Sequence, residues 1–231
     1  MLTQTLIHRG TSRPTTGRPL RPLPSVSHHH QPGTSIELMG APMPFVRNAE
    51  IYGENEPAEY LYKVITGTVR TYKVLNDGRR QIGAFYLPGD IFGLEVGEEH
   101  TFSAEAIVDC KILVIKRSTV IGLAARETDV ARQLWAMTAA ELQRGQDHIM
   151  LLIKTAQERV AGFLLEMAKR SPVGNEIDLP MSRQDIADYL GLTIETVSRT
   201  LTQLENSAAI AVPSSRRIVL RNRAALTRLN A

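Results

Sequence analysis

The stretch from Ser182 to Leu201 constrains the fold most, because its spacing describes two short helices that meet at a tight turn. Ser182 is a typical N-cap residue and is followed three positions later by Asp185. Gly191 supplies the left-handed residue that ends a helix. The residues that recur at helical spacing between these two signals are Ile186, Ala187 and Leu190. We therefore expect a first helix that ends at Gly191.

The second helix of this pair begins after Thr193, which we expect to be its N-cap. Apolar residues at helical spacing should face the core; they are Val197, Leu201 and Leu204. The residues turned outward near the helix start are Ile194, Glu195, Ser198 and Arg199. A glutamate can accept a hydrogen bond from cytosine N4, and an arginine can donate two to guanine. The pattern predicts a DNA-recognition helix, although periodicity alone also fits a helical hairpin with a solvated charged face.

The segment Gly191-Leu-Thr-x-Glu-Thr-Val-Ser-Arg199 resembles the recognition region of the CRP/FNR transcription regulators, and Glu-x-x-Ser-Arg is similar to the FNR and FixK branch. Upstream, Tyr60 to Gly67 and Pro88-Gly-Asp-Ile-Phe-Gly93 resemble the β-roll of the same family. The resemblance covers about residues 45–221. It implies an α+β protein with an N-terminal double-stranded β-roll of the cyclic-nucleotide-binding kind, a long dimerisation helix and a C-terminal winged helix-turn-helix.

The residues themselves support this order of elements. Short β-branched and aromatic runs from Phe45 to Ile115 are separated by turn signals, among them Asp77-Gly78, which predicts a hairpin. We expect four parts. They are a disordered arm at 1–35, a β-roll domain at 36–117, a dimerisation helix at 118–154 and a winged helix-turn-helix DNA-binding domain at 155–231.

A single long helix is expected from Ser118 to Ile153, since this run contains no proline and its apolar residues form one stripe. A helix this long exceeds what one small domain can cover, so pairing with a second copy is the expected solution. A helix packed wholly within its own chain stays the alternative. The residues that we expect at the dimer contact are Val130, Leu134, Leu142, Gly145, Ile149 and Leu152.

Behind this helix the chain has a second amphipathic helix from Ala156 to Lys169 and a short strand around Ile177 to Leu179. The segments 209–213 and 217–220 are expected to form a hairpin, the wing of a winged helix, whose tip holds Arg216. By resemblance, DNA phosphates are contacted by Ser182, Arg183, Gln184, Thr193 and Thr196, and we add Arg216 from the wing. A solvated turn is the alternative for the tip.

The resemblance also implies which DNA sequence is read. Relatives similar to the cyclic-AMP receptor have an arginine at the position of Ile194, which here can contact only an apolar feature such as a thymine methyl group. The implied site is TTGAT, four bases and ATCAA, a palindrome suited to a two-fold symmetric dimer. Arg199 is expected to donate to a guanine, Glu195 to accept from the paired cytosine, and Ser198 to lie against the adjacent thymine.

The β domain lacks the ligand sets of sensing relatives, so we expect no cofactor and no metal. The run from Gly93 to Ala104 contains three acids and no arginine, which disfavours a cyclic nucleotide phosphate. Cys110 is the only cysteine, which excludes a four-cysteine iron–sulfur cluster and predicts a buried structural thiol. His100 is the one histidine in the β region, and a surface-loop position is expected for it rather than a haem ligand.

The composition places the protein in a reducing compartment, which we take to be the cytoplasm. The chain has one cysteine, a net charge of +3 and no apolar run long enough to span a membrane. The first 35 residues are rich in Pro, Arg, Ser and Thr, which is typical of a disordered arm or, as an alternative, of an organellar transit peptide. A physiological metal site at His28, His29 and His30 is not expected.

The leading hypothesis is a homodimeric, sequence-specific regulator that binds double-stranded DNA without a small effector. By resemblance it is an activator that recruits RNA polymerase in the low-oxygen response. The alternative is a regulator gated by an unidentified ligand in the β-roll. A cupin-like β enzyme is disfavoured, because it needs several metal-binding histidines and the β strands offer only His100.

Overall fold

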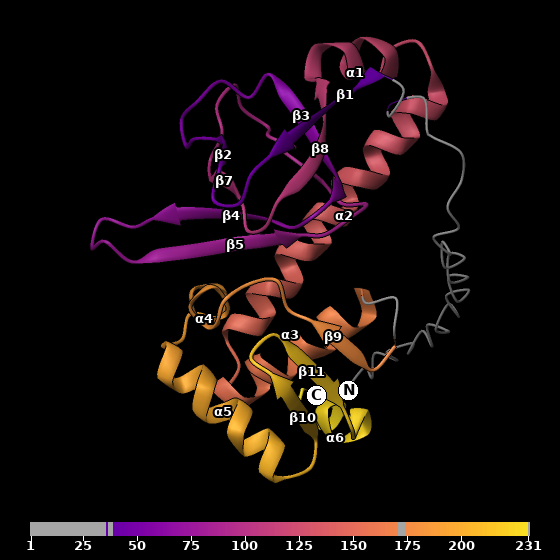
Figure 1. Cartoon of the computed structure of the whole chain (residues 1–231). Helices are drawn as coiled ribbons and strands as arrows, with labels where there is room; N and C mark the ends of the chain where they lie inside the picture. The colour runs from indigo at the N-terminus through magenta and orange to yellow at the C-terminus, as the bar shows by residue number, and fades with distance from the viewer. Residues whose placement is uncertain (1–35, 37–38, 171–173, 231) are drawn as a thin grey trace, which may run out of the picture. The chain divides into compact units, whose positions relative to one another are not determined.

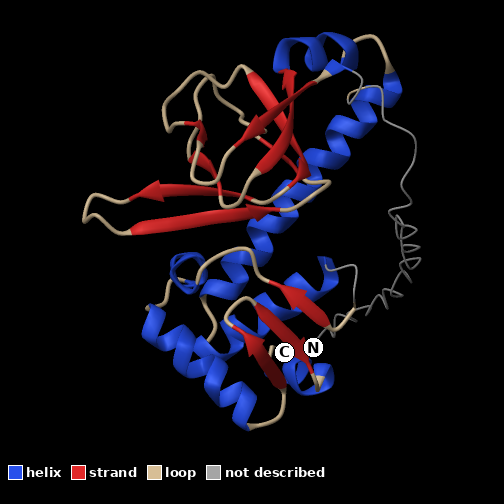
Figure 2. Cartoon of the chain, viewed as in Figure 1, coloured by secondary structure: helices blue, strands red, loops and turns tan. Residues whose placement is uncertain are grey.

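The computed structural model describes residue 36, residues 39–170 and residues 174–230. The expected arm at 1–35, with His28, His29 and His30, lies outside the described residues. The described chain divides into a region of strands and a region of helices with three further strands (Figures 1 and 2).

Eight strands form two four-stranded sheets between residues 41 and 116. One sheet has the order β1-β8-β3-β6 and the other the order β2-β7-β4-β5. Their inward side chains meet in a common core, in which Val64, Val69 and Ile112 have no exposed surface. The strands are β1 Ala41–Phe45, β2 Glu50–Tyr52, β3 Tyr60–Thr66, β4 Val69–Val74, β5 Arg80–Tyr86, β6 Ile91–Phe92, β7 Ser103–Ala106 and β8 Cys110–Lys116.

The expected Asp-Gly hairpin is confirmed as the connection between β4 and β5. Gly78 has a φ of 82°, which a residue with a side chain adopts only with strain. The Asp77 carboxylate accepts hydrogen bonds from the backbone N–H and the Nε–H of Arg79. These contacts hold the tip of a hairpin that projects well beyond its neighbours (Figure 1).

The expected long helix is confirmed as α2 Thr128–Leu152, but its predicted start at Ser118 is wrong, because a separate helix, α1 Arg117–Ala124, precedes it. Val120 in α1 and Val130 in α2 both pack into one cluster with Ile36, Leu61 and Ile115. In a straight helix, residues ten positions apart would face different directions, so the bend between α1 and α2 is what brings both valines to this core. Although α2 is 25 residues long, neither it nor any other described helix is apolar enough to cross a membrane.

The remaining elements build a helical region around a three-stranded sheet of order β10-β11-β9. The expected helix, short strand and wing hairpin are confirmed, with boundaries shifted by a residue or so. The sequence reasoning missed the last helix, whose Asn222 side chain accepts from the Ala225 N–H. The elements are α3 Ala156–Arg170, β9 Glu176–Asp178, α4 Arg183–Leu190, α5 Ile194–Asn206, β10 Ile210–Ser214, β11 Arg217–Leu220 and α6 Arg223–Leu229.

Candidate nucleic-acid interface

Helix α4 begins with a capping box. The Asp185 N–H donates to Ser182 Oγ at 3.1 Å, and the Asp185 carboxylate accepts from the Ser182 N–H at 2.9 Å. Two backbone donors that a helix start leaves unpaired are thereby satisfied. Behind this cap, Ile186, Ala187 and Leu190 are buried, as their spacing predicts. The first predicted helix is therefore confirmed from its cap to its inward face.

The turn between α4 and α5 depends on Gly191, which has a φ of 61° as expected for a helix-ending glycine. Arg159 of α3 donates from Nη1 to the carbonyl oxygen of Leu190 at 2.8 Å. The Leu192 N–H donates to the Ala187 carbonyl at 2.9 Å, which closes the end of α4. Together these bonds fix the direction in which α5 leaves the turn.

Helix α5 is capped by Thr193, whose hydroxyl accepts from the Thr196 N–H at 3.2 Å. Its inward face is buried, with Val197 and Leu204 fully enclosed and Leu201 5% exposed. All four predicted base-contacting residues are exposed on the opposite face; they are Ile194, Glu195, Ser198 and Arg199. The structure thus places these four side chains on one open surface near the start of a helix.

The polar groups on this face differ in what they contact. Ser198 Oγ donates to the carbonyl oxygen of Ile194 at 2.8 Å, which leaves its lone pairs to accept a hydrogen bond. Glu195 and Arg199 lie one turn apart, yet among the described residues neither side chain has a hydrogen bond or an ion pair. A carboxylate and a guanidinium are therefore both open to a ligand at this helix start.

The predicted phosphate contacts of α4 and α5 surround the same surface. Ser182, Gln184 and Thr193 are exposed, whereas Thr196 and Arg183 are half-buried. Burial lowers the pKa of Arg183, and its buried Nη1 has no hydrogen-bond partner within the described part of the chain. The Gln184 side chain donates to Asp188 at 2.6 Å, so it must turn to contact anything else.

The two arginines at the tip of the wing have different surroundings. Arg217 forms an ion pair with Glu176 of β9. Arg216 is exposed and has no ion-pair partner in the described segments. The preference for Arg216 as a phosphate ligand stays a prediction, and its open guanidinium is consistent with it.

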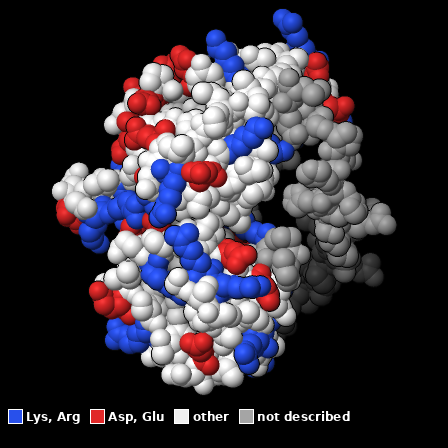
Figure 3. All heavy atoms as spheres, viewed as in Figure 1, with Lys and Arg blue, Asp and Glu red and all other residues white. Residues whose placement is uncertain are grey.

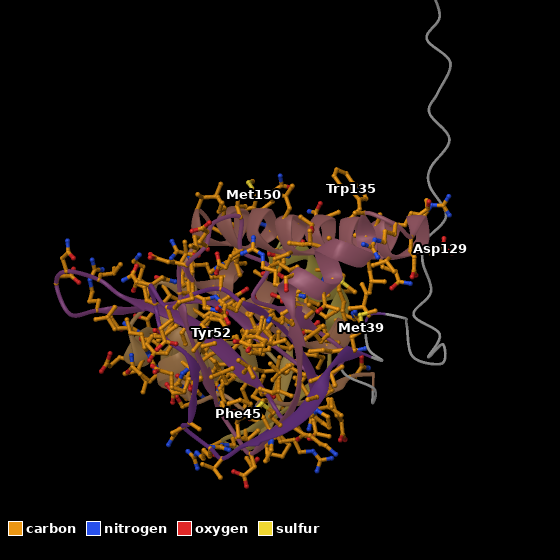
Figure 4. The ribbon with its side chains drawn as sticks, turned by 90° about the horizontal axis from the view of Figure 1, so that it is seen from above. Met39, Phe45, Tyr52, Asp129, Trp135 and Met150 are labelled. Atoms are coloured by element: carbon orange, nitrogen blue, oxygen red, sulfur yellow. The ribbon has the colours of Figure 1, made fainter. Side chains whose placement is uncertain are left out.

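The outer surface of α2 carries an apolar stripe that differs from the predicted one. Val130 has no exposed surface and Leu134 packs beside it, so the expectation that Val130 contacts a second copy is corrected. The stripe instead begins at Trp135, which is 76% exposed and was missed. Leu142 and Ile149, both 64% exposed, follow at seven-residue intervals, with Gly145 exposed between them and Leu152 half-buried beyond. Figure 4 shows Trp135 and Met150 on the side of α2 away from the strands.

Comparison with known proteins agrees with both halves of this structure. Residues 158–229 match the model of the Crp-like helix-turn-helix domain, and residues 42–127 match that of the cyclic nucleotide-binding domain. The chain is 53% identical over 206 residues to the nitrogen fixation regulation protein FixK of Azorhizobium caulinodans, covering 87% of this chain and 83% of that one. The chain belongs to the CRP/FNR family. It is a FixK-like transcription regulator with a DNA-binding helix-turn-helix, and the family is one of transcription factors rather than enzymes.

Two further relatives narrow the branch of the CRP/FNR family. The structure of FixK2 from Bradyrhizobium japonicum superimposes with a TM-score of 0.80 and 55% identity, over 83% of this chain and 98% of that chain. The transcriptional activatory protein AadR of Rhodopseudomonas palustris is 40% identical over 167 residues, which is 70% of each protein. The FixK-like resemblance inferred from Glu195, Ser198 and Arg199 is confirmed.

The interior of the cyclic-nucleotide-binding-like domain is filled by aromatic side chains. The His100 ring stacks on Tyr52 at 3.5 Å between centroids, and Tyr62 stacks on Phe92 at 5.1 Å. His100 is 1% exposed, so the expectation of a surface-loop histidine is wrong. It is buried because Tyr52, 48 positions earlier in the chain, covers its ring.

The loop that precedes His100 is held by protein groups. Arg117 donates to the carbonyl oxygens of Glu95 and Gly97 at 2.8 and 2.6 Å. Cys110 is buried as expected, and its thiol lies 3.3 Å from the Thr68 carbonyl oxygen. Burial raises the pKa of this thiol, which keeps it protonated and unreactive.

Proposed function

We propose that this CRP/FNR protein binds the palindrome TTGAT-N4-ATCAA as a homodimer in the cytoplasm and activates transcription without a small effector. The observation that carries the proposal is the exposed pair Glu195 and Arg199 at the start of α5, whose side chains have no partner in the described part of the chain. A helix fits the major groove, where guanine O6 and N7 and cytosine N4 are displayed. The activating role draws on the likeness to an activatory relative, and the low-oxygen role and recruitment of RNA polymerase draw on family resemblance.

Each exposed residue of α5 has a distinct role in this proposal. Arg199 donates two hydrogen bonds to a guanine, and Glu195 accepts from the cytosine paired with it. Ile194, 37% exposed, packs on a thymine methyl group, and the Ser198 hydroxyl lies against the neighbouring thymine. No second guanine is read, because Ile194 offers no donor.

Phosphate contacts fix the register of the recognition helix. Ser182, Gln184, Thr193 and Thr196 offer short polar groups on both sides of the turn, where they can bond to one DNA strand. Arg183 gains most from a phosphate, since its buried Nη1 has no hydrogen-bond partner among the described residues. Arg216 reaches the backbone from the wing, and this contact contributes affinity without sequence preference.

The dimer forms through the apolar stripe Trp135, Leu142 and Ile149. A repeat of seven residues keeps a helix seam facing a partner helix, and large exposed apolar side chains gain from burial there. Gly145 permits a close approach of the two helices, because outside its own stretch of helix backbone no described atom lies within 4 Å of the place a Cβ would take. The two copies then present two recognition helices to the two half-sites of a palindrome.

Effector independence is supported by the filled β domain. The rings of Tyr52, Tyr62, Phe92 and His100 occupy its interior, and the adjoining loop carries Glu95, Glu98 and Glu99, which repel a phosphate. The alternative is a regulator gated by a ligand in this domain. A ligand that binds only the folded state raises the melting temperature of the protein. A screen of metabolites for such a shift therefore distinguishes the two hypotheses.

The decisive experiment measures binding of the purified protein, with nothing added, to TTGAT-N4-ATCAA and to a scrambled duplex at one fixed salt concentration. We expect a clear preference for the palindrome. Equal affinity for both duplexes refutes the proposal. A preference that emerges only with a metabolite supports the gated alternative.

The dimer is tested by sedimentation of a Leu142→Glu variant. A charge in the stripe should yield monomers, and separate half-site binding should then weaken affinity for the palindrome by roughly 10²- to 10⁴-fold. Ala140→Glu is the matched control, since Ala140 is exposed on another face of α2. A Leu142→Glu variant that stays dimeric rules out this stripe as the interface.

A further inference from the structure

Charged side chains meet where the β4–β5 hairpin packs against α4. Figure 1 shows the backbones of these two elements. We name this group the junction cluster; it consists of Arg70, Arg80, Glu105, Asp185 and Asp188. Basic side chains gather over the same part of the face shown in Figure 3. The cluster joins residues more than a hundred positions apart, since the arginines belong to the β domain and the two aspartates to the helix-turn-helix.

Asp185 is the centre of the junction cluster and is 3% exposed. Its Oδ1 accepts from Arg70 Nη1 and from Arg80 Nη2, each at 2.7 Å. Its Oδ2 accepts from the N–H and the hydroxyl of Ser182 at 2.9 and 2.8 Å. One carboxylate therefore closes the N-cap of α4 and at the same time binds both strands of the hairpin.

A second ion pair lies one turn further along α4. Arg80 Nε donates to Asp188 Oδ2 at 2.8 Å, and the other Asp188 oxygen accepts from Gln184. The guanidinium carbons of Arg70 and Arg80 each lie 5.9 Å from the centroid of the Tyr72 ring. Both guanidinium groups thus lie close to one aromatic ring while they face α4.

The far end of α4 is held by α2. His148 Nε2 lies 2.8 Å from the carbonyl oxygen of Tyr189, and the two rings stack at 4.0 Å between centroids. Tyr189 also packs against Phe85 of β5 at 5.1 Å. Since α4 is fixed at its start by the hairpin and at its end by α2 and β5, it cannot pivot without breaking one set of contacts.

Asp185 at the centre of the junction cluster stays ionised at neutral pH. Burial alone would raise the pKa of Asp185, but the hydrogen bonds from Ser182 and the charges of Arg70 and Arg80 outweigh it and hold the pKa below its ordinary value. Separating the partners of a buried, hydrogen-bonded ion pair is strongly destabilising, because each charge has lost its hydration and then lacks a partner. The arrangement therefore favours one orientation of α4 over nearby ones.

We propose that the junction cluster positions the recognition helix for DNA binding, with Arg70 and Arg80 as positioning residues that act through Asp185 and Asp188. The cluster fixes α4 against the β domain, and the turn at Gly191 transmits this orientation to α5. This inference rests on the proposed effector-free, dimeric DNA binding, and it supplies a physical reason why no ligand is required.

Orientation matters because two recognition helices must fit two half-sites at one spacing. If only a fraction of the molecules holds α5 correctly, the apparent affinity is reduced by that fraction. A fixed junction avoids this loss, as preorganisation does in other complexes. A loosened junction should therefore weaken binding to the four-base spacing most and should accept altered spacings more readily.

The test uses full-length protein and a series of palindromes whose spacer is three, four, five or six bases. Arg80→Glu places a carboxylate against Asp185 and Asp188. We expect it to weaken binding to the four-base spacer by roughly 5- to 150-fold, the usual range for coupled sites. We also expect the ratio of affinities between the four-base and six-base spacers to fall toward one, which a uniform loss of folded protein would not produce.

The double variant Arg80→Glu/Asp188→Arg exchanges the charges of the pair and should restore both affinity and spacer preference. Arg79→Glu is the matched control, because it makes the same change in net charge at a side chain whose ion pair among the described residues is with Asp77 at the hairpin tip. An unchanged spacer ratio in Arg80→Glu overturns the proposal. A double variant that behaves like the single one also overturns it.

A measurement without DNA separates this proposal from the proposed function. Spin labels on Lys111→Cys in β8 and Gln203→Cys in α5, both exposed positions, report the distance between the two domains when the labelled chain is diluted into unlabelled chain. The native junction should give a narrow distribution, Arg80→Glu a broad one, and the double variant a narrow one again. A narrow distribution in Arg80→Glu overturns the positioning role even if DNA binding holds. If Arg80→Glu broadens the distribution but the native protein shows no preference for the palindrome, only the proposed function is refuted.

Discussion

Helices α4 and α5 are neighbours in one motif, but they differ in whether their charged side chains have partners within the protein. On α4, Asp185, Asp188 and Gln184 all have partners within the described chain. On α5, Glu195 and Arg199 are exposed and make no ion pair among the described residues. The carboxylates of α4 have their hydrogen-bonding capacity used by the protein, whereas the side chains of Glu195 and Arg199 on α5 keep theirs for a ligand.

This difference predicts which property of the protein a substitution on each helix should change. A change on α4 should reduce stability and leave the choice of DNA sequence intact in the molecules that still fold. A change on the outer face of α5 should reduce discrimination between sequences and leave stability intact. Four variants, taken from the largest expected effect to the smallest, test that division.

Asp185→Ala should have the largest effect, a loss of about 3 to 5 kcal/mol in the free energy of unfolding, because it leaves Arg70 and Arg80 without their shared carboxylate. Denaturant unfolding followed by circular dichroism measures this. Asp185→Asn is the control, since it keeps an acceptor for the cap but removes the charge, and its loss should be smaller. A stable Asp185→Ala protein with altered sequence preference would show that α4 determines the choice of DNA sequence rather than stability.

Arg199→Ala should reduce the preference for the palindrome over scrambled DNA by roughly 5- to 150-fold, equivalent to about 1 to 3 kcal/mol. Its unfolding free energy should stay within about 0.5 kcal/mol of the native value, as is usual for surface substitutions. Gln203→Ala, one turn further along the exposed side, is the control for helix content. A destabilised Arg199→Ala protein would show that α5 also depends on this side chain for folding.

Arg216→Ala should weaken binding to all duplexes alike and lower the slope of log affinity against log salt by about 0.9, the value for one phosphate contact. Fluorescence anisotropy at several salt concentrations measures the slope. Arg217→Ala is the matched control, because Arg217 is already paired with Glu176. A loss confined to the palindrome would place Arg216 among the base-reading residues.

His148→Gln should have the smallest effect, a change in pH dependence. Burial lowers the pKa of His148, and it outweighs the hydrogen bonds to the carbonyls of Tyr189 and Gly83 that raise it. The unfolded chain therefore binds the proton more readily. Stability is fully present above the ordinary value of 6.5 and is lost as the pH falls through the folded-state pKa.

We expect the melting temperature of the native protein to fall as the pH drops below 6.5, and His148→Gln to reduce that fall. The remaining fall should come from His100, whose pKa is also lowered by burial. Thermal scans across this pH range measure both contributions. Identical profiles for the two proteins would show that His148 does not contribute to the pH dependence of stability.

The recognition motif was predictable from sequence because its determinants are local. Ser182, Gly191 and Thr193 are cap or turn residues that act within a few positions of themselves, and the apolar stripes repeat at helical spacing. The Asp77-Gly78 hairpin was predictable for the same reason. In each case the residue types determine the backbone before any distant contact forms.

The errors concern features that depend on residues far apart in sequence. The bend between α1 and α2 serves a shared core, and the burial of His100 depends on Tyr52. The junction cluster could not be predicted from the sequence, because no sequence pattern relates charged residues on a strand to charged residues on a distant helix. Trp135 could have been found, since it precedes Leu142 and Ile149 at the same interval of seven.

The shared use of the Asp185 carboxylate has a consequence for local unfolding. The first turn of α4 cannot fray while the hairpin stays attached, because the cap uses Oδ2 and the hairpin uses Oδ1 of the same carboxylate. Amide hydrogen exchange near Asp185 and Ile186 therefore reports separation of the two domains, and these amides should exchange together as one cooperative unit.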